Sequence, residues 1–236
     1  MSIKKIVKLV CVLVTMVVLL VGCSNAEQED NCTNKNNTVR YNIYGGSTDD
    51  KPIIYLYPTE KMDISVKLGK AENLTCTYPK YENGWEVTAN PDGSMIDKTT
   101  GRNLYALYWE GKNTTEYDTS YGFIVKSEDT IKFLEEKLKI LGLNDREAEE
   151  FIVYWLPQMQ SNKYNYVRFA TEEEINENMP LTFSTEPDTL IRVLMIWKPL
   201  EEQIEIPEQQ LNSVERKGFV AVEWGGTKLE NAAMVE

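Results

Sequence analysis

The chain has 236 residues, of which 37 are acidic and 25 basic, and its formal net charge is −12 at pH 7. This charge argues against nucleic acid as a partner, because phosphate binding requires a basic face. The sequence has no histidine, which excludes Ser-His-Asp and Cys-His nucleophile pairs and the common His-based metal sites. Any catalysis would have to use carboxylates, Lys, Tyr or a carboxylate-bound metal. The sequence itself predicts no metal site and no cofactor.

The start of the chain has the pattern of an export signal. Three lysines precede an apolar run at residues 9–21, and this run is about 20 Å long as a helix, too short for a ~30 Å hydrocarbon core. The segment Leu20-Val21-Gly22-Cys23 then resembles the lipobox of bacterial lipoproteins. This resemblance implies a signal peptide at residues 1–22 and a diacylglycerol with an acyl chain, such as palmitate, on Cys23. It places the chain on the extracytoplasmic face of the cell membrane, held by its lipid anchor.

The residues after Cys23 are expected to form a tether and then one domain. Residues 23–38 are almost entirely polar and cannot bury enough apolar surface to order themselves. A single α+β domain is expected at residues 39–236, with a possible sub-boundary near residue 126. Because exported proteins can form disulfides, Cys32 and Cys76 are a candidate pair; the alternative is a buried Cys76 and an exposed, free Cys32.

Alternating apolar residues predict many short strands. The clearest is Met62–Leu68, where every second residue is apolar, whereas Lys51–Pro58 is apolar on both faces and predicts a central strand. The first predicted strand is Val39–Tyr44. Further strands are predicted at residues 74–78, 84–89, 103–109, 121–125, 164–169, 181–184, 189–197, 203–206 and 218–224.

Two consecutive segments in the middle of the chain predict a helical hairpin. Ser127 can cap a first helix that ends near Gly142, and Asn144 with Glu147 can form a capping box for a second helix, which Pro157 ends or kinks. A short acidic helix follows, capped by Thr171. The expected fold is therefore α+β: an antiparallel, β-rich sheet or sandwich with the helical hairpin packed against it.

Several segments together resemble a group of uncharacterised exported or lipid-anchored proteins of Firmicutes. The most specific is Lys51-Pro52-Ile53-Ile54-Tyr55-Leu56-Tyr57-Pro58, and the others are residues 105–111, 151–157 and 219–226. The likeness covers nearly the whole chain after Cys23. It implies a single family domain outside the cytoplasm and carries no activity with it.

Two tryptophans are candidates for a ligand face. Trp155 and Trp197 lie in patterns that predict burial, whereas Trp109 and Trp224 each end a predicted strand beside a carboxylate and a glycine. Aromatic rings at such positions can stack on sugars, and nearby carboxylates can accept hydrogen bonds from hydroxyl groups. The competing interpretation is that these rings fill the core.

Glu110 and Glu223 are the carboxylates next to these two tryptophans. A pair of carboxylates that straddles a glycosidic bond could hydrolyse it. The leading hypothesis is nevertheless a binding or interaction module for a glycan, a peptide or an envelope protein, because no catalytic motif is present. The alternatives are a carboxylate-based hydrolase of cell-wall or environmental polymers and a structural subunit of an envelope assembly.

Overall fold

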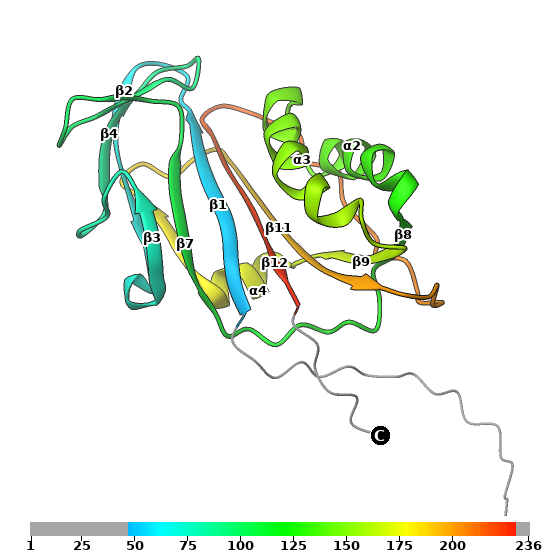
Figure 1. Ribbon diagram of the computed structural model, residues 1–236. Coiled ribbons are helices and arrows are strands. Elements are labelled where there is room, and N and C mark those ends of the chain that lie inside the picture. The colour runs from blue at the N-terminus through cyan, green and yellow to red at the C-terminus, as the bar shows by residue number, and fades with distance from the viewer. Residues whose placement is uncertain (1–46, 230–236) are drawn as a thin grey trace, which may run out of the picture. The chain divides into compact units, whose positions relative to one another are not determined.

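The computed structural model describes residues 47–229, which form two β-sheets and three α-helices (Figure 1). The larger sheet has seven strands in the order β3 (Leu74–Tyr78), β7 (Leu107–Asn113), β1 (Ser47–Tyr57), β12 (Val220–Lys228), β11 (Thr189–Leu200), β9 (Tyr164–Phe169) and β8 (Phe123–Lys126). Neighbouring strands are antiparallel, except β11 and β12, which are parallel. Strands from both sides of residue 126 therefore share one sheet.

The smaller sheet has five strands and packs against one face of the larger sheet. Its strands lie in the order β10 (Leu181–Phe183), β2 (Met62–Leu68), β4 (Trp85–Ala89), β5 (Met95–Asp97) and β6 (Asn103–Leu104). Strand β2 spans the predicted residues, and its side chains Ile64, Val66 and Leu68 are buried. They form a core with Ile54 and Leu56 of β1, so the smaller sheet covers that face of the central strand.

Three helices cover the larger sheet. Helices α2 (Thr130–Ile140) and α3 (Asp145–Met159) form the predicted hairpin on one face, and α4 (Glu172–Asn178) lies on the other (Figure 1). The capping box of α3 and the Thr171 cap of α4 are present as predicted, and Glu174 completes a second capping box with Thr171. A 3₁₀ turn, Ser127–Asp129, precedes α2, and one more, Ala71–Asn73, precedes β3.

Two details of these helices differ from the predictions. The side chain of Ser127 does not cap α2; its hydroxyl donates instead to the carbonyl of Asn162. Of the two alternatives for Pro157, that it ends or kinks the helix, the first is wrong, because α3 continues to Met159. A proline removes a backbone donor but can remain within a helix when neighbouring contacts hold it there, and the adjacent Trp155 is buried completely.

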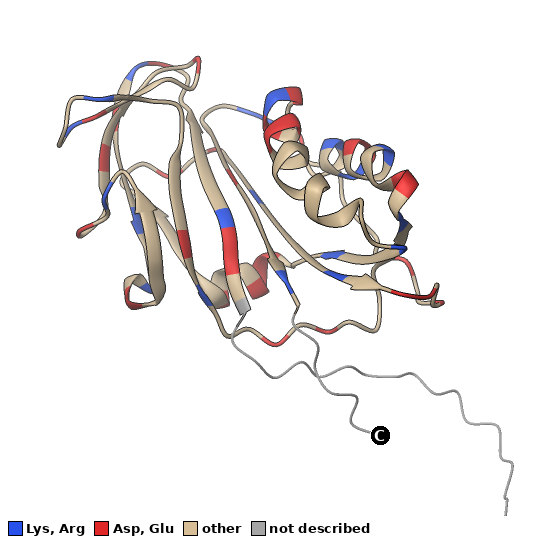
Figure 2. Cartoon of the chain, viewed as in Figure 1, with Lys and Arg blue, Asp and Glu red and all other residues tan. Residues whose placement is uncertain are grey.

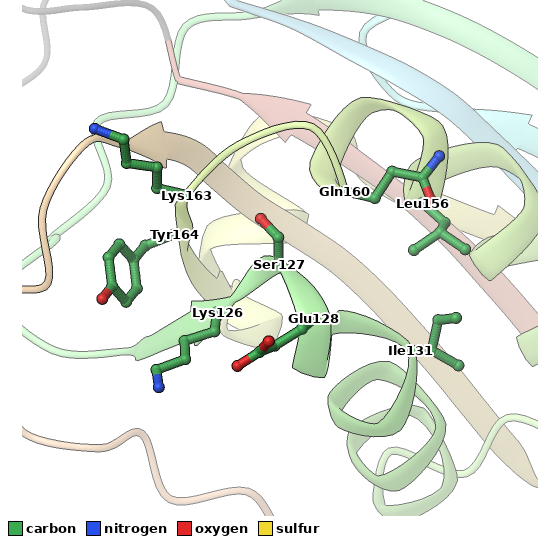
Figure 3. Close-up of a pocket in the computed structure, with 8 residues that line it drawn as sticks. All are labelled: Lys126, Ser127, Glu128, Ile131, Leu156, Gln160, Lys163 and Tyr164. Carbon is green, nitrogen blue, oxygen red and sulfur yellow. The ribbon is translucent and has the colours of Figure 1, made fainter.

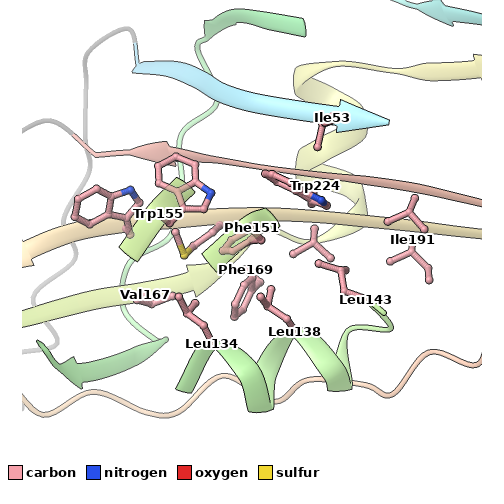
Figure 4. Close-up of a cluster of buried hydrophobic side chains, with 14 of the residues drawn as sticks. Ile53, Leu134, Leu138, Leu143, Phe151, Trp155, Val167, Phe169, Ile191 and Trp224 are labelled. Carbon is pink, nitrogen blue, oxygen red and sulfur yellow. The ribbon is translucent and has the colours of Figure 1, made fainter. Parts of the chain in front are cut away.

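The core between the hairpin and the sheet is rich in aromatic side chains. Phe151 and Trp155 of α3 pack against Trp224 of β12 and Trp197 of β11 (Figure 4). Their ring centroids lie 5.4–6.3 Å apart with inclined planes, as aromatic pairs prefer. Burial of Trp155 and Trp197 is thus confirmed.

The central strand β1 faces both cores. Tyr55 and Tyr57 point toward the hairpin, where the Tyr55 hydroxyl donates to Glu150 of α3 at 2.7 Å. The guanidinium of Arg216 lies 5.1 Å from the Tyr57 ring and donates to Glu147 of α3 at 2.7 Å. These contacts attach the hairpin to the central strand.

The predicted α+β fold is confirmed, with differences at its margins. Residues 203–206 form no strand. The irregular segment that contains them leads to Glu208, which forms an isolated bridge with Gly122, the residue before β8. The predicted strand Val39–Tyr44 lies outside the described residues, as does Cys23. Within residues 47–229 no helix is both long and apolar enough to cross a membrane.

Substituting Gly226→Ala tests how closely the hairpin packs on the sheet. A Cβ atom on Gly226 would lie 2.6 Å from Cζ2 of Trp155 and 2.9 Å from the Met195 carbonyl oxygen, and neither group has room to move. We expect a loss of about 1–3 kcal/mol in the free energy of unfolding, measured by urea denaturation. Val153→Ala on the exposed side of α3 is the control and should change stability by less than about 0.5 kcal/mol. Equal effects of the two substitutions would contradict the packing.

Candidate functional site

The structure buries both tryptophans of the predicted ligand face. Trp109 is 2% exposed and Trp224 is fully buried, and they belong to the cores on opposite faces of the larger sheet. The prediction assumed that each tryptophan ends its strand, but β7 continues to Asn113 and β12 to Lys228. The glycines that suggested strand ends lie inside the strands, where Trp155 packs on Gly226 and Pro52 on Gly225.

The two predicted carboxylates are also separated by the sheet. Glu223 points to the same side as Trp109, whose indole nitrogen donates to it at 2.9 Å. Glu110 is next to Trp109 in the strand and therefore points to the hairpin side, where it is half-buried near Tyr108 and Asp50. These two acids therefore cannot straddle one bond.

Glu223 instead takes part in a buried ion pair that fixes α4. Nε of Arg192 donates to Glu223 at 2.6 Å, and both side chains are less than a tenth exposed. The same guanidinium donates to Asn176 of α4 at 2.8 Å and to the Met179 carbonyl at 2.9 Å. Removing one partner of such a pair leaves a buried, uncompensated charge. Its geometry therefore indicates a structural role.

A second buried carboxylate, Asp49, lies beside this ion pair. It is fully buried at the start of β1 and accepts hydrogen bonds from the amides of Asn113, at 2.6 Å, and Asn178. Burial raises the pKa of Asp49 to about 7, the two amides oppose that shift, and the nearby charge of Glu223 adds to it. Asp49 therefore changes protonation state near neutral pH.

The space around Asp49 and Glu223 is too small for a substrate. The cavity that they line, with Asn178 and Met179 of α4 as its cover, has a volume of about 10 Å³. This is room for one water molecule at most. In the described part of the chain, no three acidic or cysteine side chains come together as a metal site. The cluster can hold a proton, but a sugar ring does not fit.

Among residues 47–229 the exposed aromatic side chains are Tyr78 and Tyr105, and with the half-buried Tyr108 and Tyr154 they border one region that we call the tyrosine face. It consists of Tyr78 on β3, Tyr105 just before β7, Tyr108 on β7 and Tyr154 on α3. Tyr78 and Tyr105 are about half exposed, and Tyr78 lies directly opposite Tyr108 in the sheet. Arg146 of α3 lies 4.8 Å from the centre of the Tyr105 ring.

Lys51 lies at the centre of the tyrosine face. Its Nζ is 5.4 Å from the centre of the Tyr154 ring and 5.9 Å from that of Tyr108. Its backbone has a φ of +62°, in the left-handed region, at a bulge where the pairing of β1 with both neighbours shifts register. Among the described residues it is the only non-glycine residue with positive φ. A lysine there costs free energy that a glycine would not, and Pro52 next to it favours an extended backbone.

Carboxylates accompany Lys51 on this face. Figure 2 shows acidic positions on β1 and β7 next to each other, close to the basic stretch of β1. Burial, and next the charge of Glu110, raise the pKa of Asp50 above its usual value. Burial, followed by a hydrogen bond to Glu110, raises the pKa of the Tyr108 hydroxyl. The tyrosine face therefore combines aromatic rings with charges of both signs.

Larger hollows exist, but their walls hold no catalytic arrangement. One hollow of about 730 Å³ lies where α3 ends and α2 begins, and Figure 3 shows Ser127 and Glu128 on one side of it and Leu156 and Gln160 on the other. Lys163 also lines it and pairs with Glu201 at 3.0 Å. A hollow of about 370 Å³ beside Trp85 is lined mainly by hydroxyl and charged side chains from strands and loops of the smaller sheet. Neither brings an acid and a base onto one reacting position.

Sequence reasoning missed the residues that make the tyrosine face. Lys51 was read only as the first residue of a strand, although a Lys-Pro pair at the start of an apolar strand could have indicated an irregular backbone. Cys76 of β3 is exposed and lies opposite Glu110, which contradicts the expectation that it is buried. The predicted Cys32–Cys76 disulfide stays a prediction, because Cys32 lies outside the described residues.

Asp49→Asn tests the buried carboxyl group through the pH dependence of stability. The folded-state pKa of Asp49, about 7, exceeds the usual aspartate value of 3.8, so between these pH values the folded state binds more protons than the unfolded state. Stability contributed by Asp49 is therefore present at low pH and is lost as pH rises through 7. Asparagine, like a protonated aspartate, is uncharged and has a donor group beside an acceptor oxygen. Relative to the parent, we expect the variant to gain about 2–4 kcal/mol between pH 5 and pH 8, measured by urea denaturation.

Glu60→Gln, at an exposed position, is the control and should follow the parent curve. If the stability of Asp49→Asn falls with pH in parallel with the parent, Asp49 does not titrate as the structure requires.

Comparison with known proteins adds one relative. No protein-family model matches the chain, and no solved structure matches it. Sixty-six residues of the chain are 42% identical to "Uncharacterized protein in bglA 3'region" of Butyrivibrio fibrisolvens, a match that covers 27% of this chain and 67% of that protein. The chain therefore belongs to the same family as this uncharacterised Butyrivibrio protein.

Proposed function

We propose that the chain is a lipid-anchored, extracytoplasmic interaction module that binds a protein or peptide partner on the tyrosine face. The observation that carries this proposal is the backbone of Lys51. Strained non-glycine residues persist where surrounding structure holds them, and they cluster at functional sites. At this position the strain places an ammonium group between two tyrosine rings of the exposed face.

The composition of the face favours a protein partner. Tyrosine and arginine are enriched at the centres of protein interfaces, because each combines a large contact area with polar groups. Val153 adds an apolar side chain that is 68% exposed, one and two helical turns from Glu150 and Arg146 on the same side of α3. The face thus offers apolar area and charges of both signs to a partner.

A glycan has less support as the ligand. Sugars stack on a free aromatic face, but all five tryptophans are buried. Of the tyrosines on the face, Tyr105 already carries Arg146 over its ring, and Tyr108 and Tyr154 carry Lys51. A peptide can use such rings from their edges and pair with the charges, so it fits the same surface without displacing them.

The hydrolase alternative depends on two carboxyl groups that lie close together, and the two predicted acids do not. Glu110 and Glu223 lie on opposite faces of the sheet, and Asp49, whose pKa is raised, lines a space for one water. Hydrolysis of a polymer needs two carboxyl groups in an open cleft. The interaction module needs only the exposed face.

The anchor part of the proposal depends on Cys23. Because two or more acyl chains hold a protein on a membrane, the Cys23→Ser variant should incorporate no radiolabelled palmitate and should leave the membrane fraction. Cys76→Ser is the matched control and should incorporate label like the parent. Unchanged labelling of Cys23→Ser would refute the lipid anchor, but it would not affect the proposal that the tyrosine face binds a partner.

Lys51→Gly separates stability from binding. Glycine tolerates a positive φ, so the relief of strain should offset the loss of the cation–π contacts, and the free energy of unfolding should change by less than about 1 kcal/mol. Lys51→Ala keeps the strain and loses the contacts, so it should be the less stable of the two. Both variants should reduce partner binding at least tenfold, because both lack the ammonium group.

Binding is measured by photo-cross-linking on intact cells that express the full chain. A photoreactive phenylalanine analogue replaces Tyr105 or Val153 on the tyrosine face, or Ile96 on β5 as an exposed control on the smaller sheet. We expect a discrete adduct from the first two positions, none from Ile96, and loss of the adduct in the Lys51 variants. Equal adducts from all three positions, or adducts unaffected by Lys51→Gly, would overturn the proposal.

A further inference from the structure

Strand β3 is an open edge of the seven-stranded sheet. It pairs with β7 on one side, and no other strand of the described residues pairs with it on the other. Thr75 and Cys76 are exposed, and Tyr78 is half exposed. An edge strand presents unpaired backbone N–H and C=O groups, which are a template for another strand.

At the opposite edge of the same sheet, the residue before β8 pairs with another segment of the chain. Beside β8, the backbone N–H of Gly122 donates to the Pro207 carbonyl at 3.0 Å, and the Gln209 N–H donates to the Gly122 carbonyl at 3.2 Å. Strand β8 also ends in Lys126, a charged residue of the kind that protects natural edges. The β8 edge therefore has a charged residue and backbone pairing next to it, whereas the outer side of β3 has neither among the described residues.

Strand β3 has no charged residue. Its sequence is Leu-Thr-Cys-Thr-Tyr, and its only irregularity is a register shift between Leu74 and Cys76. This sequence is self-complementary in an antiparallel pair centred on Cys76. Such a pair places Thr75 opposite Thr77 of the other copy, and a Thr–Thr cross-strand contact stabilises sheets. Leu74 lies beyond the register shift and packs in the core with the smaller sheet.

We propose that β3 pairs with β3 of a second copy of this chain about a two-fold axis at Cys76, so that the two seven-stranded sheets become continuous. A two-fold axis perpendicular to the sheet keeps the faces of the strands in register, so side chains meet their like on the same side. The charged residue nearest to the axis, Glu110, is one strand further in on each copy. The two glutamates would thus be about 14 Å apart across three strand spacings, where salt screens their repulsion.

This geometry makes Cys76 a direct probe of the pairing. Opposed residues in an antiparallel pair have Cα atoms about 4.5 or 5.5 Å apart, and both values lie within the range of about 4.4–6.8 Å that a disulfide bridges. Copper(II) phenanthroline oxidises two Cys76 thiols to one disulfide, with release of two protons and transfer of two electrons to copper. The full chain with Cys32→Ser is used in its membranes, so that Cys76 is the free thiol under test.

We expect a band of twice the chain's mass on a non-reducing gel, and Cys76→Ser should abolish it. Thr75→Lys adds a charge at the open edge and should lower the dimer yield at least fivefold. In the Cys76→Ser background, Ile96→Cys on β5 is exposed but lies away from this edge, so it should give no dimer. The register is tested with the double variant Thr75→Cys, Thr77→Cys. It should form more disulfide-linked dimer than Thr75→Cys alone, because the proposed pairing places residue 75 opposite residue 77 of the other copy.

Three results would overturn the pairing: no dimer from Cys76, as much dimer from Ile96→Cys as from Cys76, or a yield unaffected by Thr75→Lys. If the chain with Cys32 intact instead forms an internal Cys32–Cys76 disulfide and stays monomeric, the edge is not free for a second copy. None of these results bears on the proposed binding at the tyrosine face, which is tested separately by cross-linking at Tyr105 and Val153.

Discussion

Strand β1 carries apolar side chains on both faces, so each face needs a cover of its own. Ile54 and Leu56 point into the core with the smaller sheet, and Ile53 and Tyr55 point into the core with the hairpin. Because adjacent residues of a strand point to opposite sides, one short segment requires both layers. The hydrogen bond from Tyr55 to Glu150 then fixes where the hairpin lies along the strand.

The start of β1 departs from this alternation, and two unusual charged residues, Asp49 and Lys51, lie there. Two other buried carboxylates of the described domain are paired with arginine, Glu147 with Arg216 and Glu223 with Arg192. Asp49 has only amide donors, so a proton replaces the missing cation near neutral pH. Two residues later Lys51 leaves the sheet plane at the bulge, which turns its side chain to the surface.

Regular features of the domain follow from local sequence, and the irregular ones do not. The alternation in Met62–Leu68 and the capping box at Asn144 and Glu147 predicted their elements correctly, because each depends on neighbours in the chain. The candidate site was misread at Trp224, because glycines usually mark strand ends. Here Gly226 makes room for Trp155, a contact between residues 71 positions apart that no local pattern encodes.

The distribution of aromatic rings links the two surfaces. All five tryptophans are buried in the cores, whereas the tyrosines of the tyrosine face lie on β3, on and just before β7, and on α3, where a hydroxyl can remain solvated. The open edge belongs to one of the same strands. Pairing about Cys76 would therefore place two tyrosine faces on one side of a continuous sheet. A partner with two contact segments would engage both at once, and its second contact would gain from effective concentration without any new interaction.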